Sequence, residues 1–185
     1  MLEDQLLICK FKFGNIDALC RIYEKYKNEL LKLAIVLTGD APASEDLVQD
    51  VFLRFAQSAD DVSLNGNLRR FLATCVANRS RNFVRDRGRH AAGVIEENSS
   101  AVCHEKRPDQ WAILSEELAL LGHAMSKLPY EQREVIGLYM QGDMTFRRIA
   151  RIQNASINTV QGRYRYGIKK LRSFLNGELD NETHR

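Results

Sequence analysis

Apolar residues recur at steps of three and four along most of this 185-residue chain, and this spacing limits the fold more than any other feature. Steps of three and four place side chains on one face of an α-helix. Almost no segment alternates with the period of two that a half-buried strand requires. The pattern therefore predicts an all-α fold. In the first long helix, which Asn15 or Asp17 can cap and which Gly39 ends, the spaced residues are Leu19, Ile22, Tyr23, Tyr26, Leu30, Leu33 and Leu37.

Two regions with this spacing are separated by an aperiodic stretch, which predicts two small helical domains joined by a flexible linker. The first domain covers residues 1–87, and the second covers residues 111–175. Gly, Ser, Asn and Pro punctuate residues 88–110 between them, a composition typical of linkers. An acidic tail over residues 176–185 follows the second domain.

The end of the second domain has the pattern of a helix-turn-helix. Thr145 can cap a short helix, and Ser156 can cap a longer basic helix after the turn formed with Asn154 and Ala155. In DNA-binding proteins the second helix of such a unit enters the major groove. The other interpretation is a helical hairpin used for protein contacts. The residues expected to form the small core between the two helices are Ile149, Ile157 and Val160.

Charge is distributed unevenly, although the formal net charge is only +3. Residues 66–90 hold seven Arg and one Asp, and residues 145–172 hold eight Lys or Arg and no acid. Residues 40–61 hold six acids and one Arg. Two basic blocks indicate two contacts with a polyanion, and the acidic block indicates a different partner. The alternative is that these blocks are solvated helix faces.

Several functional classes lack their usual residues in the sequence. The four Cys include no C-x-x-C pair, and Cys103-His104 is the only adjacent Cys and His, so we expect reduced thiols, no metal and no cofactor. Paired catalytic carboxylates, a nucleophile–base set and a phosphate-binding loop are missing, so we expect no enzyme. The longest apolar runs, such as residues 34–37, are far shorter than the roughly 18 residues of a membrane span. We therefore expect a cytoplasmic protein without membrane insertion.

Five segments of the chain resemble one known family. Residues 42–53, PASEDLVQDVFL, resemble the core-polymerase-binding helix of the bacterial sigma factors of the sigma-70 superfamily, in particular that of the small extracytoplasmic-function (ECF) group. Residues 17–26 are similar to the family's opening helix, and Phe71-Leu72 with Asn78 is similar to its promoter-melting helix. Residues 128–135, LPYEQREV, and residues 149–160 resemble the domain that reads the upstream promoter element.

The resemblance covers about residues 15–87 and 111–175, with three departures from the family pattern. Phe71 stands where the family usually has Trp. Asn154 stands at a turn position that is usually Gly. Gln161-Gly162 stands where a basic residue followed by Ser is frequent.

The resemblance implies a protein that is not an enzyme but binds core RNA polymerase and directs it to promoters. The helix over residues 42–56 is implied to dock on the clamp coiled coil of the large β′ subunit. The implied polymerase contacts are Glu45, Asp46, Gln49 and Asp50. The other implied partners are the polymerase β subunit, promoter DNA and an anti-sigma factor, which commonly clamps such proteins when they are inactive.

The first domain is further implied to melt and read the −10 element, using the loop over residues 60–67 and the helix that follows it. Amides of Asn78 and Asn82 can pair with a base edge, although Asn78 can also simply stabilise the helix surface. The implied −10 contacts are Arg69, Arg70, Asn78, Arg79, Asn82 and Arg85, and Arg81, Arg87 and Arg89 would also follow the phosphates.

The second domain is implied to read the −35 element with its last helix. Arg can pair with guanine, and Gln can pair with adenine, in the major groove. Arg163 lies one turn into this helix, where it can reach a base edge or a phosphate. The implied −35 contacts are Asn158, Thr159, Gln161, Gly162, Arg163, Arg165, Tyr166 and Lys169, with Arg147, Arg148, Arg151 and Lys170 as further phosphate contacts.

Two other functions remain open from the residues alone. A helix-turn-helix regulator could bind DNA without polymerase, but the motif at residues 45–53 argues against it. A helical interaction protein or anti-sigma-like protein would have no DNA role, and the two basic blocks argue against that function.

Overall fold

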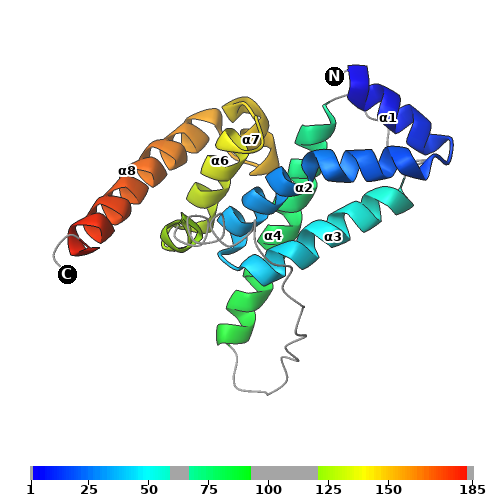
Figure 1. The fold of residues 1–185 in the computed structure, drawn as a ribbon. Helices are drawn as coiled ribbons and strands as arrows, with labels where there is room; N and C mark the ends of the chain where they lie inside the picture. The colour runs from blue at the N-terminus through cyan, green and yellow to red at the C-terminus, as the bar shows by residue number, and fades with distance from the viewer. Residues whose placement is uncertain (1, 59–66, 93–120, 183–185) are drawn as a thin grey trace.

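The computed structural model describes residues 2–58, 67–92 and 121–182, and every regular element in these ranges is an α-helix (Figure 1). The all-α class predicted from the apolar spacing is confirmed. Residues 121–126 are helical as well. Along the chain the helices are α1 (Leu2–Lys12), α2 (Ile16–Thr38), α3 (Ala41–Gln57), α4 (Leu68–Ala92), α6 (Tyr130–Met140), α7 (Phe146–Ile152) and α8 (Ile157–Glu182).

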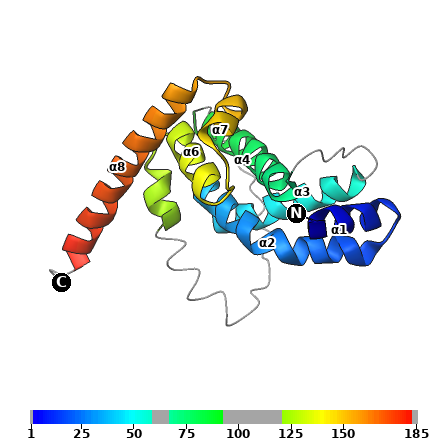
Figure 2. The same cartoon turned by 90° about the horizontal axis from the view of Figure 1, so that it is seen from above.

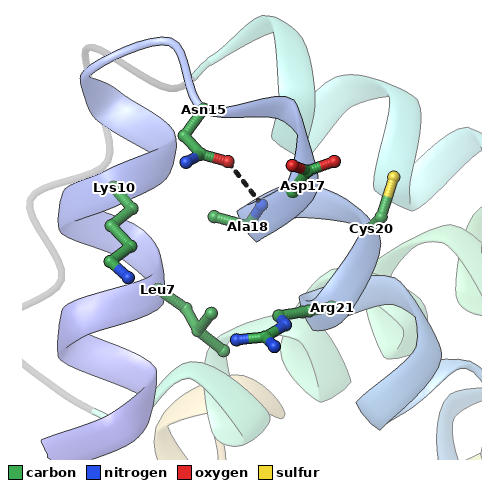
Figure 3. A pocket seen from close by; sticks show the side chains of 7 residues that line it. All are labelled: Leu7, Lys10, Asn15, Asp17, Ala18, Cys20 and Arg21. Carbon is green, nitrogen blue, oxygen red and sulfur yellow. Dashed lines mark hydrogen bonds between the residues drawn. The ribbon is translucent and has the colours of Figure 1, made fainter.

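Local capping sets the ends of α2 and the start of α3. The Asn15 Oδ1 atom accepts a hydrogen bond of 3.1 Å from the Ala18 N–H, so Asn15 rather than Asp17 caps α2 (Figure 3). Gly39 follows α2 with a φ of 72°, a left-handed conformation that glycine adopts without steric cost. Asp40 then caps α3, so two consecutive residues end one helix and begin the next.

Helices α1 to α4 form the first unit, in which α2 contacts each of the other three (Figures 1 and 2). The whole apolar stripe of α3 and most of that of α2 are buried, as their spacing predicts. Helix α1 was not predicted. It is tied to α2 by Lys25, which donates hydrogen bonds to Glu3 at 2.6 Å and Asp4 at 2.8 Å.

Residues 121–126, α6, α7 and α8 form the second unit, and α7 and α8 have the arrangement of a helix-turn-helix. Thr145 caps α7 and Ser156 caps α8, as predicted. Asn154 in the turn has a φ of 48°, which Asn tolerates better than most residues. Helix α8 packs against α6 and α7, and its C-terminal end points away from the rest of the molecule (Figure 1).

The core of the helix-turn-helix differs from the prediction at one residue. Ile149 and Val160 are fully buried, but Ile157 keeps 42% of its surface exposed. Ile157 is the first residue of α8 and lies one turn before Val160, at the open end of the helix. Ala155 of the turn packs against this core instead.

The second unit packs on the C-terminal half of α2 and on α4 (Figures 1 and 2). Residues 34–37 are therefore buried around the whole circumference of α2, with α3 and α4 on one side and α6 on the other. Gly137 lets α6 approach closely, because a Cβ atom there would lie 3.0 Å from Leu33 Cδ1. The two units consequently share one continuous apolar core.

Two helices run past the predicted domain boundaries. Helix α4 continues to Ala92, so the predicted linker over residues 88–110 begins with helical residues. Helix α8 continues to Glu182, inside the predicted acidic tail over residues 176–185. Outside the described residues lie the rest of the predicted linker with Cys103-His104, residues 111–120 of the predicted second domain, and all but Asn67 of the loop expected over residues 60–67.

Candidate polymerase and promoter surfaces

Helix α3 presents a polar face opposite its buried stripe. Glu45, Asp46 and Gln49 are exposed on it. Leu53 lies one turn beyond Gln49 and keeps 58% of its surface exposed. Two acids, an amide and a leucine therefore form a continuous surface that a protein partner can cover. Leu53 was missed as a candidate, although a large apolar residue off the buried stripe is a signal for such a contact.

The fourth polymerase-binding candidate, Asp50, has a structural role as well. It is half-buried and accepts a hydrogen bond of 3.3 Å from Arg54, one turn further along α3. It also forms an ion pair with Arg79 of α4. Asp50 thus joins α3 to α4, and Arg79, a −10 candidate, is engaged in the same contact.

Three of the −10 candidates lie together on the exposed side of α4. Asn78, Asn82 and Arg85 are exposed and follow each other at steps of four and three, which places them on one helix face. Arg85 lies 3.5 Å from its neighbour Asp86, but exposed pairs of this kind contribute little and exchange easily. This face offers two amides and a cation to a nucleic acid strand.

Two other −10 candidates contact the second unit instead. Arg69 forms an ion pair with Glu29 of α2 and donates a hydrogen bond of 3.1 Å to the Gln141 carbonyl. Arg70 donates to the Asp143 carbonyl at 2.9 Å and to its carboxylate at 3.1 Å. Both acceptors follow α6, far from α4 in sequence, so spacing within α4 could not predict these contacts.

Glu134 of α6 is a carboxylate with only 1% of its surface exposed, placed between the two units. Arg81 of α4 donates to its Oε1 at 2.6 Å, and Gln153 donates to its Oε2 at 2.9 Å. Gln153 in turn accepts a hydrogen bond of 2.7 Å from Arg163 of α8. Burial raises the pKa of Glu134, and the contacts with Arg81 and Gln153 oppose that rise. A chain of polar contacts therefore connects α4 with α8.

The candidate −35 residues divide between one exposed face of α8 and three other positions, Thr159, Gly162 and Arg163. Asn158, Gln161, Arg165 and Lys169 recur at steps of three and four on one exposed face. Tyr166 is exposed beside them, with 67% of its surface accessible. This face combines two side-chain amides, two cations and an aromatic ring.

The three other −35 candidates differ from these residues in what surrounds them. The Thr159 N–H donates to the capping Ser156 Oγ at 3.0 Å. Arg163 is half-buried, and its contact with Gln153 holds the guanidinium toward α7. Apart from its chain neighbours and the backbone of its own helix, Gly162 has no atom within 4 Å of the position that a Cβ would occupy. Arg165 and Gln161 are therefore better placed than Arg163 to reach a base edge.

Gly162→Ala should raise the stability of the chain and lower its affinity for −35 DNA. Glycine within a helix costs roughly 0.5–1 kcal/mol relative to Ala, and no packing atom opposes the added methyl group here. We expect the free energy of unfolding, measured by urea denaturation, to rise by about that amount. If DNA affinity is unchanged in the same variant, Gly162 does not admit a close approach of DNA.

Other chemistry is sparse in the described ranges. They contain no group of three or more His, Cys, Asp and Glu residues that could hold a metal ion. No helix in them has the length and apolar character needed to cross a membrane. Cys9 and Cys20 are exposed thiols, and burial raises the pKa of the half-buried Cys75. The hollow at the corner of α1 and α2 is lined by the Asn15 cap, by the buried Leu7 and Ala18 and by exposed side chains such as Lys10 and Arg21 (Figure 3).

Comparison with known families identifies two regions of the chain. Residues 22–90 match the family described as Sigma-70 region 2, and residues 118–171 match Sigma-70, region 4. The first match contains α3 and most of α4, and the second contains the helix-turn-helix. These two regions define a sigma-70-type factor.

A curated relative narrows the class. The chain is 30% identical to the ECF RNA polymerase sigma factor EcfG of Rhodopseudomonas palustris over 146 residues. The aligned part covers 79% of this chain and 78% of EcfG. The chain belongs to the ECF family of RNA polymerase sigma factors. It binds core RNA polymerase and directs promoter-specific initiation of transcription, as the resemblance in the sequence implied.

Two solved structures share the fold. One is CnrH in complex with the cytosolic domain of CnrY, with a TM-score of 0.68, 22% identity and coverage of 95% of this chain and 98% of that chain. The other is the sigma factor RpoE of Bartonella quintana in complex with the anti-sigma factor NepR, with a TM-score of 0.59, 23% identity and coverage of 84% and 97%. The similarity covers both units of the chain.

Proposed function

We propose a division of labour between the two domains of this sigma factor. Residues 1–87 bind the β′ clamp of core polymerase through α3 and read the −10 element through α4, and residues 111–175 read the −35 element through α8. The observation that carries the proposal is the exposed polar face of α3, which includes Asp46 and Gln49. This face lies on a different helix from the exposed faces of α4 and α8 that carry basic residues. Residues 88–110 connect the two domains.

We also propose a location, a lack of catalytic activity and an inhibitory partner for the chain. It acts in the cytoplasm, where core polymerase and promoter DNA are found, and has no catalytic activity of its own. An anti-sigma factor holds it when it is inactive. The complex of the sigma factor RpoE with the anti-sigma factor NepR supports this last point. A regulator that works without polymerase is not favoured, because it leaves the α3 surface without a partner.

Runoff transcription with purified core polymerase on a promoter library tests the proposal directly. The full chain should direct transcripts from a defined subset of promoters, and those promoters should share a −10 and a −35 element. DNA binding without any polymerase-dependent transcript would favour the regulator instead.

Asn78→Ala should lower runoff transcription from such a promoter about tenfold or more, while core binding stays unchanged. The Asn78 amide is exposed on the face of α4 proposed to capture an unstacked base, and an amide–base pair contributes roughly 1–3 kcal/mol. Asn28→Ala, an exposed Asn on α2, is the matched control and should leave transcription unchanged. If Asn78→Ala lowers only the melting temperature, Asn78 stabilises the helix surface and does not contact a base.

A further inference from the structure

Helix α1 carries apolar side chains on two faces, and only one of these faces is covered by the rest of the described chain. Leu7 and Ile8 are buried against α2, and Phe11 stacks on Phe55 of α3 with ring centroids 5.6 Å apart. On the other face Leu6 keeps 55% of its surface exposed. A helix that is apolar on both sides is normally covered on both sides. The outer face of α1 therefore lacks a partner among the described residues.

The uncovered face is a continuous stripe. Leu6, Cys9 and Phe13 follow each other at steps of three and four, and all three are exposed. Phe13 lies just past the end of α1, but its N–H donates a hydrogen bond of 3.2 Å to the Cys9 carbonyl, so it continues the helical spacing. It keeps 87% of its surface exposed. Contiguous exposed apolar residues mark protein interaction sites, so this outer stripe is a candidate for one.

One flank of the outer stripe carries a charge of each sign. Glu3 lies in the first turn of α1 and Lys10 lies in its last turn. The two residues are about two helical turns apart, so they lie on the same side of the stripe. The Glu3 side chain remains 70% exposed in its contact with Lys25, and Lys10 is exposed and forms no ion pair with another described residue. Both charges are therefore accessible to a partner.

We propose that the outer stripe packs against the same stripe of a second copy of this chain, with the two α1 helices antiparallel and related by a twofold axis. In a twofold pair every contact occurs twice. The same flank of both helices meets and runs in opposite directions, so Glu3 of each copy faces Lys10 of the other. Leu6 of each copy then packs beside Cys9 of the other. Antiparallel packing also brings opposite ends of the two helix dipoles together.

The charge pattern favours a second copy over a partner that carries charge of one sign. An acidic partner helix or a DNA backbone would be attracted by Lys10 and repelled by Glu3, whereas an antiparallel copy satisfies both. The aliphatic side chain of Leu6 offers no hydrogen bond to a phosphate. Helix α1 also precedes residues 22–90, which match Sigma-70 region 2, and none of the proposed polymerase or promoter contacts lies on it.

Pairing through α1 leaves the −35 surface of each copy uncovered, because α8 lies at the opposite end of the molecule from α1 (Figures 1 and 2). The contact area is small, since three exposed side chains of each copy supply most of it. Interfaces that bury less than about 1,200 Å² in total are usually weak. We therefore expect a dissociation constant of about 10–100 μM for the dimer.

Sedimentation equilibrium of the full chain, without polymerase or DNA, tests the inference. Between about 5 and 300 μM, the weight-average mass should rise from the monomer value of 21.2 kDa toward twice that value. A mass that stays at the monomer value throughout would show that no second copy occupies the stripe. A mass that rises past the dimer would show that association does not close around a twofold axis. Either result would overturn the inference.

Leu6→Ser should raise the dissociation constant of the dimer about tenfold or more, because each dimer buries two Leu6 side chains. Leu6 is more than half exposed in one copy, so the thermal unfolding of the variant should be normal. Leu53→Ser is the matched control, because it removes the same side chain from α3, where 58% of it is exposed. It should change the dissociation constant less than twofold. Equal effects of the two substitutions would place the contact elsewhere than on α1.

Charge reversal tests the antiparallel geometry independently of the apolar contact. Lys10→Glu and Glu3→Lys should each weaken self-association about tenfold or more, because like charges then face each other twice. Asp4 keeps its hydrogen bond of 2.8 Å from Lys25, so α1 stays attached to α2 in the Glu3→Lys variant. An equimolar mixture of the two variants should dimerise about as tightly as the unaltered chain, because one variant supplies two acids and the other supplies two bases. Variants that still dimerise alone, or a mixture that stays monomeric, would contradict the proposed pairing.

Discussion

Replacement of Asp46 and Gln49 by Arg should lower the affinity of the chain for core RNA polymerase about 100-fold or more. Both side chains lie on the exposed face of α3, and the double substitution changes the local charge by three units. Like charges brought together at an interface cost several kcal/mol, and 100-fold corresponds to about 2.7 kcal/mol. The buried stripe of α3, which includes Val48 and Phe52, is not altered. The measurement is a titration of labelled core polymerase with the full chain.

The fold should tolerate this change, and a variant on the same helix provides the control. Surface substitutions away from caps and buried networks usually change stability by less than about 0.5 kcal/mol. Gln57→Arg places the same new charge on an exposed position two turns beyond Gln49 and should change core affinity less than threefold. Unchanged core affinity in the Asp46→Arg/Gln49→Arg variant, with normal thermal unfolding, would remove α3 from the polymerase interface.

Features set by neighbouring residues in the chain could be predicted from the sequence. The stripe on α3, the Gly39 end of α2 and the caps Thr145 and Ser156 depend on groups within one or two helical turns. Helical periodicity and capping rules describe interactions of that range. Three of the four polymerase-binding candidates on α3, Glu45, Asp46 and Gln49, are exposed, because the buried stripe leaves only one side of the helix for polar side chains.

Contacts between the domains could not be predicted in the same way. Arg70 and Arg81 were assigned to DNA because the block around them is basic, and the structure shows that distant carboxylates hold both. One signal did exist in the sequence. Residues 34–37 are apolar around the whole circumference of α2, and a helix with that pattern is covered on all sides.

Ile157 shows a similar limit within the second domain. Its spacing from Val160 fits an inward-facing position, but it occupies the first turn of α8, where no facing helix covers it, and remains 42% exposed. Periodicity gives the direction of a side chain and does not give the length of the neighbouring helix. Exposure of Ile157 beside Asn158 adds an apolar residue to the proposed −35 surface, where it could contact a thymine methyl group.

Arg165→Ala should lower transcription from the cognate promoter about tenfold or more and relax the base preference at one position of the −35 element. Arg165 is exposed on the face of α8 shared with Gln161, and a bidentate contact of Arg with guanine is worth roughly 1–3 kcal/mol. Arg163→Ala, two residues earlier, removes the same functional group. Because Gln153 holds the Arg163 guanidinium at 2.7 Å, we expect a smaller loss with base preferences unchanged.

The decisive measurement compares these variants on a set of promoters that differ by single bases in the −35 element. Lys169→Ala is the reference for a phosphate contact, and it should weaken all promoters alike and reduce the salt slope by about one. Arg165→Ala should instead lower the ratio between the best promoter and one particular set of mismatches. If Arg163→Ala changes that ratio and Arg165→Ala does not, Arg163 must leave Gln153 when DNA binds. The contact between Arg163 and Gln153 would then belong to the free chain alone, and promoter binding would have to break the polar chain that leads from α8 to Glu134.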